Sequence, residues 1–233
     1  MNAMTRTTGL LLVAIPLVFT AGFTGLQMTF DYPDILRRPA GEVLTRFAAA
    51  GADLHLYWYA MMAAAIAMIP AAIGLGLRLW EEDRFLAALS IGAGVLAGLV
   101  QALGLLRWVL LVPMLAAGYV APDATEASRQ VAAALFDAAN HYLGMGVGEH
   151  LGYFFTGGWT LVVAGLIWRQ HRIVAAAGAL IALGVLVGMA EPFGVPLAGT
   201  INSISYSLWA LWLLVLGVIV LRDGRVPSGV VAA

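Results

Sequence analysis

The longest apolar stretch of the chain lies at residues 85–119, which read FLAALSIGAGVLAGLVQALGLLRWVLLVPMLAAGY and carry one charged side chain, that of Arg107. A helix needs about 20 predominantly apolar residues to cross the hydrocarbon core of a bilayer, because each residue advances it by about 1.5 Å. This stretch therefore predicts a membrane span. Pro113 predicts a kink in that span or the end of its regular part.

Further segments meet the same criterion, and the predicted spans are residues 9–28, 55–79, 85–119, 146–168, 173–190 and 200–221. An alternative for residues 9–28 is a signal peptide, but the apolar run is long and Thr20-Ala21-Gly22 is a poor cleavage signature, so we expect a retained span. The sequence predicts an all-α polytopic bundle of six transmembrane helices, forming a single transmembrane domain over residues 1–233.

Composition excludes other classes of protein. The 233 residues are 62% hydrophobic and 11% charged, whereas a soluble domain is about 25% charged. The chain has no cysteine, which excludes a disulfide scaffold and any metal site that uses thiolate ligands. The net charge of −1 supplies no basic surface for nucleic acid. The expected partner is the lipid bilayer, and not nucleic acid.

Arginine alone sets the predicted orientation, because the chain contains no lysine. On the side of the N-terminus, close to the span ends, lie Arg6, Arg78, Arg84, Arg169, Arg172, Arg222 and Arg225. On the other side, in longer loops, lie Arg37, Arg38, Arg46 and Arg129. The positive-inside rule then predicts a multi-pass membrane protein with both termini in the cytoplasm.

Two segments outside the spans, residues 29–54 and 125–143, are predicted to lie on the outer face as lids with short interfacial helices. Residues 41–50 indicate such a helix, with Glu42 and Arg46 four residues apart and an apolar side made of Val43, Leu44 and Phe47. Residues 128–168 would form a helix of about 60 Å, twice the membrane thickness, so this segment should either break or project far outside. The glycines of residues 144–148 are the expected place of a break. Trp58, Trp108 and Trp159 are expected in the outer aromatic belt.

Polar residues of several spans fall at one predicted depth, near the outer boundary. Counting about 20 residues from the cytoplasmic arginines reaches this level near Gln101, Arg107, Glu149, Glu191 and Asn202. His55 opens the second span on the same side. Charges within spans are costly unless paired. Arg107 and Glu149 are isolated in apolar surroundings, so we expect them to pair across two helices. For each residue taken alone, ordinary placement at the interface is the alternative.

Glycines and histidines suggest two further arrangements. Gly144, Gly148 and Gly152 form a stripe of small residues that permits close helix packing. Asp137 and His141 are four residues apart on one helix face, where they can share a proton or a metal. A haem or metal site would have to use His55 with His141 or His150. None of the histidine spacings is typical of a zinc site, so we expect no metal and no cofactor.

Three segments resemble a family of bacterial six-span membrane proteins catalogued as a domain of unknown function. They are Phe30-Asp31-Tyr32-Pro33-Asp34-Ile35-Leu36-Arg37, the segment from Gln101 to Trp108, and the segment from His141 through Gly148-Glu149-His150-Leu151-Gly152-Tyr153. The resemblance covers nearly the whole chain. It implies a bacterial inner-membrane protein and brings no activity, cofactor or catalytic residue.

Three functions remain open from the sequence. The first is binding of a small polar or anionic molecule or ion in a pocket built around Arg107 and Glu149, and lined by His55, Gln101, His141, Glu191 and Asn202. The second is an interaction module without chemistry, in which the glycine stripe docks a partner helix or a second copy. The third is a redox protein with haem or metal. An enzyme is the less favoured interpretation.

Overall fold

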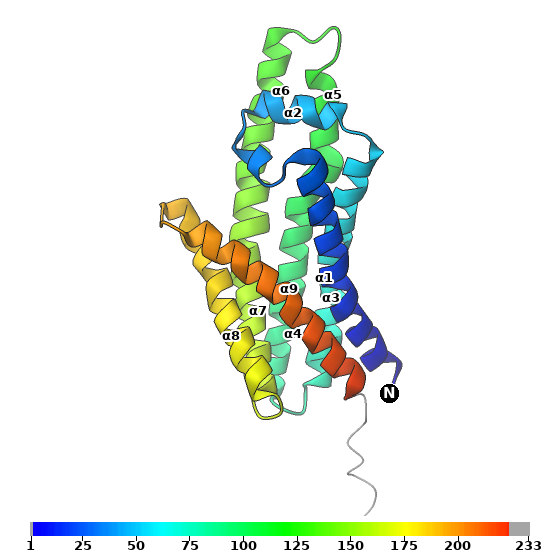
Figure 1. The fold of residues 1–233 in the computed structure, drawn as a ribbon, viewed down its shortest axis with the longest axis vertical. Coiled ribbons are helices and arrows are strands. Elements are labelled where there is room, and N and C mark those ends of the chain that lie inside the picture. Colours follow the sequence, from blue (N-terminus) through cyan, green and yellow to red (C-terminus); the bar gives the residue numbers. More distant parts are fainter. Residues whose placement is uncertain (1, 224–233) are drawn as a thin grey trace, which may run out of the picture. The chain divides into compact units, whose positions relative to one another are not determined.

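The computed structural model describes residues 2–223, and within this range the secondary structure is helical, without strands. Six helical segments of the described range are long and apolar enough to cross a membrane. They are Ala3–Phe30 (α1), Ala52–Arg78 (α3), Arg84–Tyr119, Glu126–Ile167, Arg172–Phe193 and Ala198–Arg222 (α9). The predicted all-α polytopic membrane bundle is confirmed, and Figure 1 shows the course of the chain. Arg225 lies outside the described residues.

The third span changes its winding at Arg107. Regular α-helix α4 (Arg84–Leu106) is followed by a π-helical turn η2 (Arg107–Leu111) and then by α5 (Val112–Tyr119). Pro113 stands in the first turn of α5. Proline has no backbone N–H to donate a hydrogen bond to the carbonyl one turn earlier, and its ring clashes with that carbonyl. The wider π turn lies directly before this proline, where the regular α-helix was expected to end.

The fourth span is one continuous helical segment. It consists of α6 (Glu126–Ala139), a π-helical segment η3 (Asn140–Leu151) and α7 (Gly152–Ile167). Thr125 caps its start, since the side chain of Thr125 accepts a hydrogen bond from the backbone N–H of Ser128 at 3.1 Å. The break predicted at residues 144–148 is wrong. The chain there widens into π-helix, which keeps the backbone groups hydrogen-bonded inside the membrane.

Contacts between Cα atoms divide the chain into two compact units. Unit 1 comprises Met1–Leu17, Ile66–Gly98 and Gly152–Ala233, and unit 2 comprises Val18–Ala65 and Leu99–Leu151. Helices α1, α3 and α4 contribute residues to both units.

In unit 2, the short helices η1 (Asp34–Arg37) and α2 (Ala40–Ala49) fill the connection between α1 and α3. Helix α2 packs on α5 and α6, as Figure 1 shows. Its buried side chains are Ala40, Val43, Leu44 and Phe47. Glu42 and Arg46 form an ion pair of 2.9 Å across one turn. The predicted amphipathic helix is confirmed with its ends shifted by one residue.

An aromatic cluster forms the core of unit 2. Trp58 and Trp108 stack face to face, with ring centroids 4.4 Å apart and planes 2° apart. Phe30, Phe47 and Phe136 meet the Trp108 ring at centroid distances of 5.8–6.0 Å. The indoles of Trp58 and Trp108 are fully buried. Their predicted place in the aromatic belt is therefore wrong, because neighbouring aromatic rings cover them.

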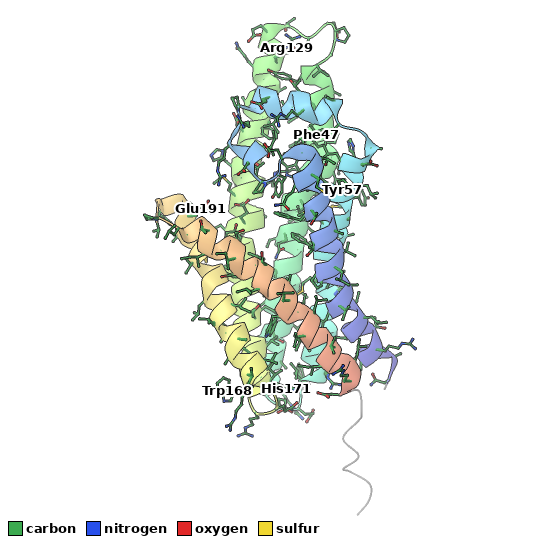
Figure 2. The ribbon with its side chains drawn as sticks, in the orientation of Figure 1. Phe47, Tyr57, Arg129, Trp168, His171 and Glu191 are labelled. Atoms are coloured by element: carbon green, nitrogen blue, oxygen red, sulfur yellow. The ribbon has the colours of Figure 1, made fainter. Side chains whose placement is uncertain are left out.

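In unit 1, α7 packs on α8 (Arg172–Val187), and α8 packs on α9. The 3-10 turn η4 (Gly188–Phe193) ends α8. Figure 2 places Trp168 and His171 at the turn between α7 and α8, and Glu191 at the opposite end of α8. Trp159, also expected in the aromatic belt, is fully buried here, between Trp209 and Trp212.

Candidate functional site

Arg107 is the buried charge of unit 2, with 6% of its surface exposed. It stands at the first position of the π turn η2. One terminal nitrogen of its guanidinium, Nη1, donates to the carbonyl of Gly104, and Nη2 donates to Oδ1 of Asn140 at 3.1 Å. The Nε–H group has no hydrogen-bond partner among the described residues. The two terminal nitrogens of the guanidinium are therefore held by hydrogen bonds, and its Nε–H group is left without an acceptor in this part of the chain.

Glycines bring the third and fourth spans against each other around this guanidinium. A Cβ atom on Gly144 would lie 2.6 Å from Nη2 and 2.7 Å from Cζ of Arg107. A Cβ on Gly104 would lie 2.6 Å from the Cα of Gly148, and one on Gly148 would lie 3.0 Å from the Cα of Gly104. Gly144 and Gly148 of the predicted stripe thus pack within the chain. Gly152 is buried in unit 1.

The stacked indoles lie beside the same guanidinium. The Cζ atom of Arg107 is 5.4 Å from the ring centroid of Trp108, within the range of a cation–π contact. The Nε1–H groups of Trp58 and Trp108 also lack hydrogen-bond partners in the described part of the chain. Three buried donors without acceptors therefore belong to one neighbourhood, which is unusual because buried polar groups are generally hydrogen-bonded.

Tyr32 and Glu149 share this electrostatic neighbourhood. The Tyr32 ring packs edge-on against Trp58, with centroids 5.0 Å apart. Burial, together with the negative charge of Glu149, raises the pKa of Tyr32 to about 12, and the charge of Arg107 acts in the opposite direction. The phenol is therefore protonated at neutral pH. Arg107 and Glu149 both act on Tyr32, and their direct pairing stays a prediction.

The other predicted site residues of unit 2 have separate surroundings. Gln101 is half-buried on α4, close in sequence to Arg107. His55 is exposed and packs edge-on against Phe47, with ring centroids 5.2 Å apart. His141 is exposed, and its Nδ1 lies 3.1 Å from the backbone oxygen of Asp137, one turn earlier on the same helix.

Asn202 and Glu191 belong to unit 1. Asn202 is buried, and its Nδ2 donates to the carbonyl of Val185 at 2.8 Å, which links α9 to α8. Glu191 is exposed in η4, where its carboxylate lies over Gly199. The buried amide of Asn202 thus satisfies a neighbouring helix, as polar side chains commonly do between membrane helices.

Metal and haem ligation find no support in the described residues. No group of three or more His, Asp or Glu side chains in residues 2–223 could hold a metal ion. His55 and His141 are exposed, and His150 is half-buried. Sequence reasoning also missed Tyr32, Trp58, Trp108 and Asn140 as neighbours of Arg107. The available signal was the place of Tyr32 and Trp108 inside the quoted motifs.

Comparison with known families covers most of the chain. Residues 7–217 match the family described as "Domain of unknown function (DUF4386)". The chain belongs to this family. No curated protein and no solved structure matches it. Membership of DUF4386 agrees with the resemblance found in the sequence, and the description of the family names no activity. A functional assignment therefore has to come from the chemistry of the site.

The contact between Gly104 and Gly148 predicts a stability difference between two glycines of the same segment. Gly148→Ala places a methyl group 3.0 Å from the Cα of Gly104, so the packed backbone has to give by a few tenths of an ångström. We expect the substitution to lower the free energy of unfolding by about 1–3 kcal/mol. Gly146→Ala is the matched control, because its Cβ would meet the His141 carbonyl at 3.5 Å, an ordinary contact. Thermal unfolding in detergent measures both, and equal melting temperatures would contradict the packing.

The raised pKa of Tyr32 predicts a loss of stability in alkali. Between pH 10 and the folded-state pKa of about 12, the unfolded chain loses this proton while the folded chain keeps it. The free energy of unfolding should therefore fall over this window by up to roughly 3 kcal/mol, with the full contribution present below pH 10. Tyr32→Phe should remove this part of the fall, and Tyr59→Phe, which removes an exposed phenol, should not.

The measurement is the melting temperature of each variant between pH 9 and pH 12, with tyrosinate absorbance at 295 nm recorded in parallel. The difference between the wild-type and Tyr32→Phe absorbance curves should have its midpoint near pH 12. A midpoint near pH 10 would show that the phenol is not buried as described.

Proposed function

We propose that this integral membrane protein binds a small polar or anionic molecule or ion at the buried guanidinium of Arg107. The observation that carries the proposal is the Nε–H of Arg107, which is buried and has no acceptor within residues 2–223. The indole N–H groups of Trp58 and Trp108 add two donors in the same condition. A buried donor without a partner costs about 1–3 kcal/mol, and an acceptor bound there would remove this cost.

The chemistry of the neighbourhood favours an acceptor with at most one negative charge. The unpaired polar groups of this neighbourhood, Nε of Arg107 and Nε1 of both indoles, are donors. Tyr32 stays protonated at neutral pH, because its pKa is raised to about 12. The positive charge of Arg107 attracts an anion. The negative charge of Glu149 opposes the binding of a ligand with a second negative charge. A small monovalent anion or a neutral molecule with carbonyl or hydroxyl oxygens fits this balance.

The backbone around Arg107 supports the same proposal. π-Helical turns are rare in proteins overall, but those that occur are often at functional sites. Here η2 contributes Arg107, and η3 contributes Asn140 and Gly144. The close approach of Gly144 and the Asn140 hydrogen bond fix the guanidinium in place. A binding group held before the ligand arrives needs less ordering on binding.

No observation in the described residues favours the two alternative functions. A partner helix would need the face of Gly144 and Gly148, and this face already packs on Arg107 and Gly104. A redox centre would need clustered ligands, which the described residues do not supply.

The proposed location is the bacterial inner membrane, with both termini in the cytoplasm. Within unit 1, Arg78 donates from Nη2 to the backbone oxygen of Asp223 at 3.2 Å, and Nε2 of His171 lies 3.2 Å from a carboxylate oxygen of Asp223. Gln170 donates to Glu82 at 2.6 Å. The arginine-rich turns and the end of α9 thus share one end of unit 1, which supports a common membrane side, and the positive-inside rule makes that side cytoplasmic.

The chain's lack of cysteine makes this topology directly testable. Glu81→Cys and Asp123→Cys each introduce a single thiol at an exposed position. In bacterial cells with a permeabilised outer membrane, a membrane-impermeant maleimide should label the Asp123→Cys variant, and it should label the Glu81→Cys variant only after lysis. The reverse pattern would invert the proposed orientation.

Ligand binding is tested by thermal unfolding in different sodium salts at constant ionic strength and pH 7. The probes are chloride, nitrate and acetate, with bulky gluconate as the reference anion. At ten times its dissociation constant, a bound anion stabilises the fold by about 1.4 kcal/mol, which corresponds to about 3–6 °C for a chain of this size. Wild-type protein should show such a shift with at least one small anion.

Trp108→Phe separates donation by the indole from ring packing. The variant keeps an aromatic ring but loses the Nε1–H group, so the anion-dependent shift should fall, with an affinity weakened about tenfold. Trp159→Phe is the matched control, because Trp159 is also fully buried and its Nε1 also lacks a partner in residues 2–223, but it belongs to unit 1. Equal melting temperatures in all salts, or equal loss in both variants, would refute the proposal.

A further inference from the structure

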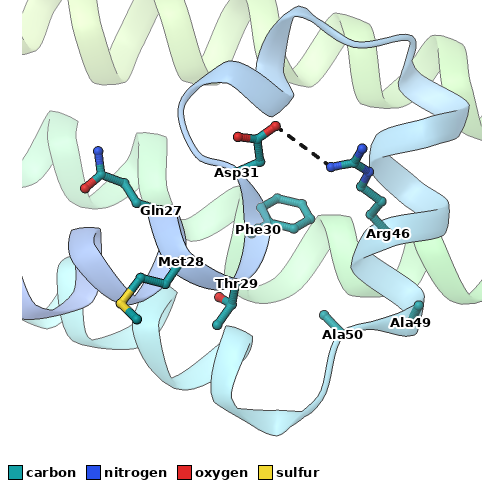
Figure 3. A pocket seen from close by; sticks show the side chains of 8 residues that line it. All are labelled: Gln27, Met28, Thr29, Phe30, Asp31, Arg46, Ala49 and Ala50. Carbon is teal, nitrogen blue, oxygen red and sulfur yellow. Dashed lines mark ion pairs between the residues drawn. The ribbon is translucent and has the colours of Figure 1, made fainter.

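A separate cavity of about 530 Å³ lies in unit 2, where α1 ends and α2 returns. Figure 3 shows its walls, which include the polar side chains of Gln27, Thr29, Asp31 and Arg46. Met28 and Ala49 are among the apolar residues that complete it. The volume lies within the range of small-molecule binding sites. Arg107 is not among the lining residues.

Two opposite charges face this cavity as a long, partly exposed ion pair. Nη1 of Arg46 lies 3.9 Å from Oδ2 of Asp31, as the dashed line in Figure 3 marks. This distance is too long for a hydrogen bond. The Arg46 and Asp31 side chains are 45% and 53% exposed, so both can accept a ligand. The other arm of Arg46, Nη2, is anchored by Glu42 at 2.9 Å, which orients the guanidinium toward the cavity.

The length of α1 supports a position of the cavity at the level of the lipid headgroups. Helix α1 has 28 residues and is therefore about 42 Å long. A bilayer measures about 30 Å across its hydrocarbon core and about 40–45 Å with its headgroups. Gln27, Thr29 and Asp31 stand at the last turn of this helix and just after it. Met28, with 82% of its surface exposed, adds an apolar surface at the same height.

From these observations, we propose that the cavity binds the headgroup of a bilayer phospholipid that carries a phosphate and a primary ammonium group. Nη1 of Arg46, the arm that Glu42 does not hold, can donate a charge-assisted hydrogen bond to a phosphate oxygen. A primary ammonium has three N–H donors, and the cavity offers acceptors on Asp31, Gln27 and Thr29. Met28 and Ala49 contact the apolar part of the lipid.

A primary ammonium fits better than a quaternary one. Quaternary ammonium groups have no N–H donor and are recognised by cages of aromatic rings. Phe30 is the aromatic residue of this cavity, and it is buried, with 2% exposed. An acidic lipid without an ammonium group would leave Asp31 facing a like charge.

The test measures the melting temperature of the purified protein in detergent supplemented with one phospholipid at a time. Phosphatidylethanolamine, phosphatidylcholine and phosphatidylglycerol with identical acyl chains are compared. Phosphatidylethanolamine should stabilise the wild-type protein most. Asp31→Asn and Arg46→Gln should each weaken its apparent affinity about tenfold or more. Asparagine tolerates the left-handed backbone of residue 31, where φ is 56°, so Asp31→Asn changes the charge and not the fold.

Asp34→Asn and Arg37→Gln are the matched controls, because this exposed ion pair of 2.6 Å stands a few residues away and does not line the cavity. Equal stabilisation by the three lipids, strongest stabilisation by phosphatidylglycerol, or equal loss in the control variants would overturn the proposal. Equal protection by soluble phosphoethanolamine would overturn the lipid as its source. Trp108→Phe should leave the lipid effect unchanged, so this proposal and the anion proposal fail separately.

Discussion

The burial of the Arg107 guanidinium is the constraint on which the arrangement of unit 2 depends. A charge inside an apolar span needs compensation by hydrogen bonds and opposite charge. The chain supplies the carbonyl of Gly104, the amide of Asn140 and the electrostatic influence of Glu149. The Gly104 carbonyl belongs to the same span as Arg107, three residues earlier. Asn140 reaches Arg107 from the fourth span, which meets the third backbone to backbone at Gly104 and Gly148 and places Gly144 against the Arg107 side chain.

The same packing explains why the site is rich in donors. The Trp108 ring is covered by Trp58 and by the phenyl rings of α1, α2 and α6. The Trp58 ring also packs against Tyr32, and both indoles are fully buried, so their N–H groups are removed from water. In the part of the chain that the structure describes, neither indole donates to an acceptor. The short helix α2 covers this core with its apolar side and turns Glu42 and Arg46 outward. One helix thus closes the aromatic core and also forms a wall of the cavity at the end of α1.

The sequence predicted only part of the candidate site. Arg107 stands out in the sequence because its apolar surroundings make any charge conspicuous. Its contact with Asn140 could not be read from spacing, because the two residues belong to different spans and lie 33 positions apart in the chain. His55 and His141, chosen for their chemistry and height, turn out to be exposed. Depth along a helix axis follows from counting residues, but the direction of a side chain around that axis does not.

Hydropathy and length alone determined the membrane spans, and the alternation of Val43, Leu44 and Phe47 with Glu42 and Arg46 determined the amphipathic helix, because both signals are local and periodic. The tertiary structure alone decided that Trp58, Trp108 and Trp159 are core residues and that the glycines at positions 144 and 148 pack against the third span. A tryptophan is equally compatible with a membrane interface and with an aromatic core. Only contacts between residues distant in sequence distinguish the two, since they decide which surface each ring loses to a neighbour.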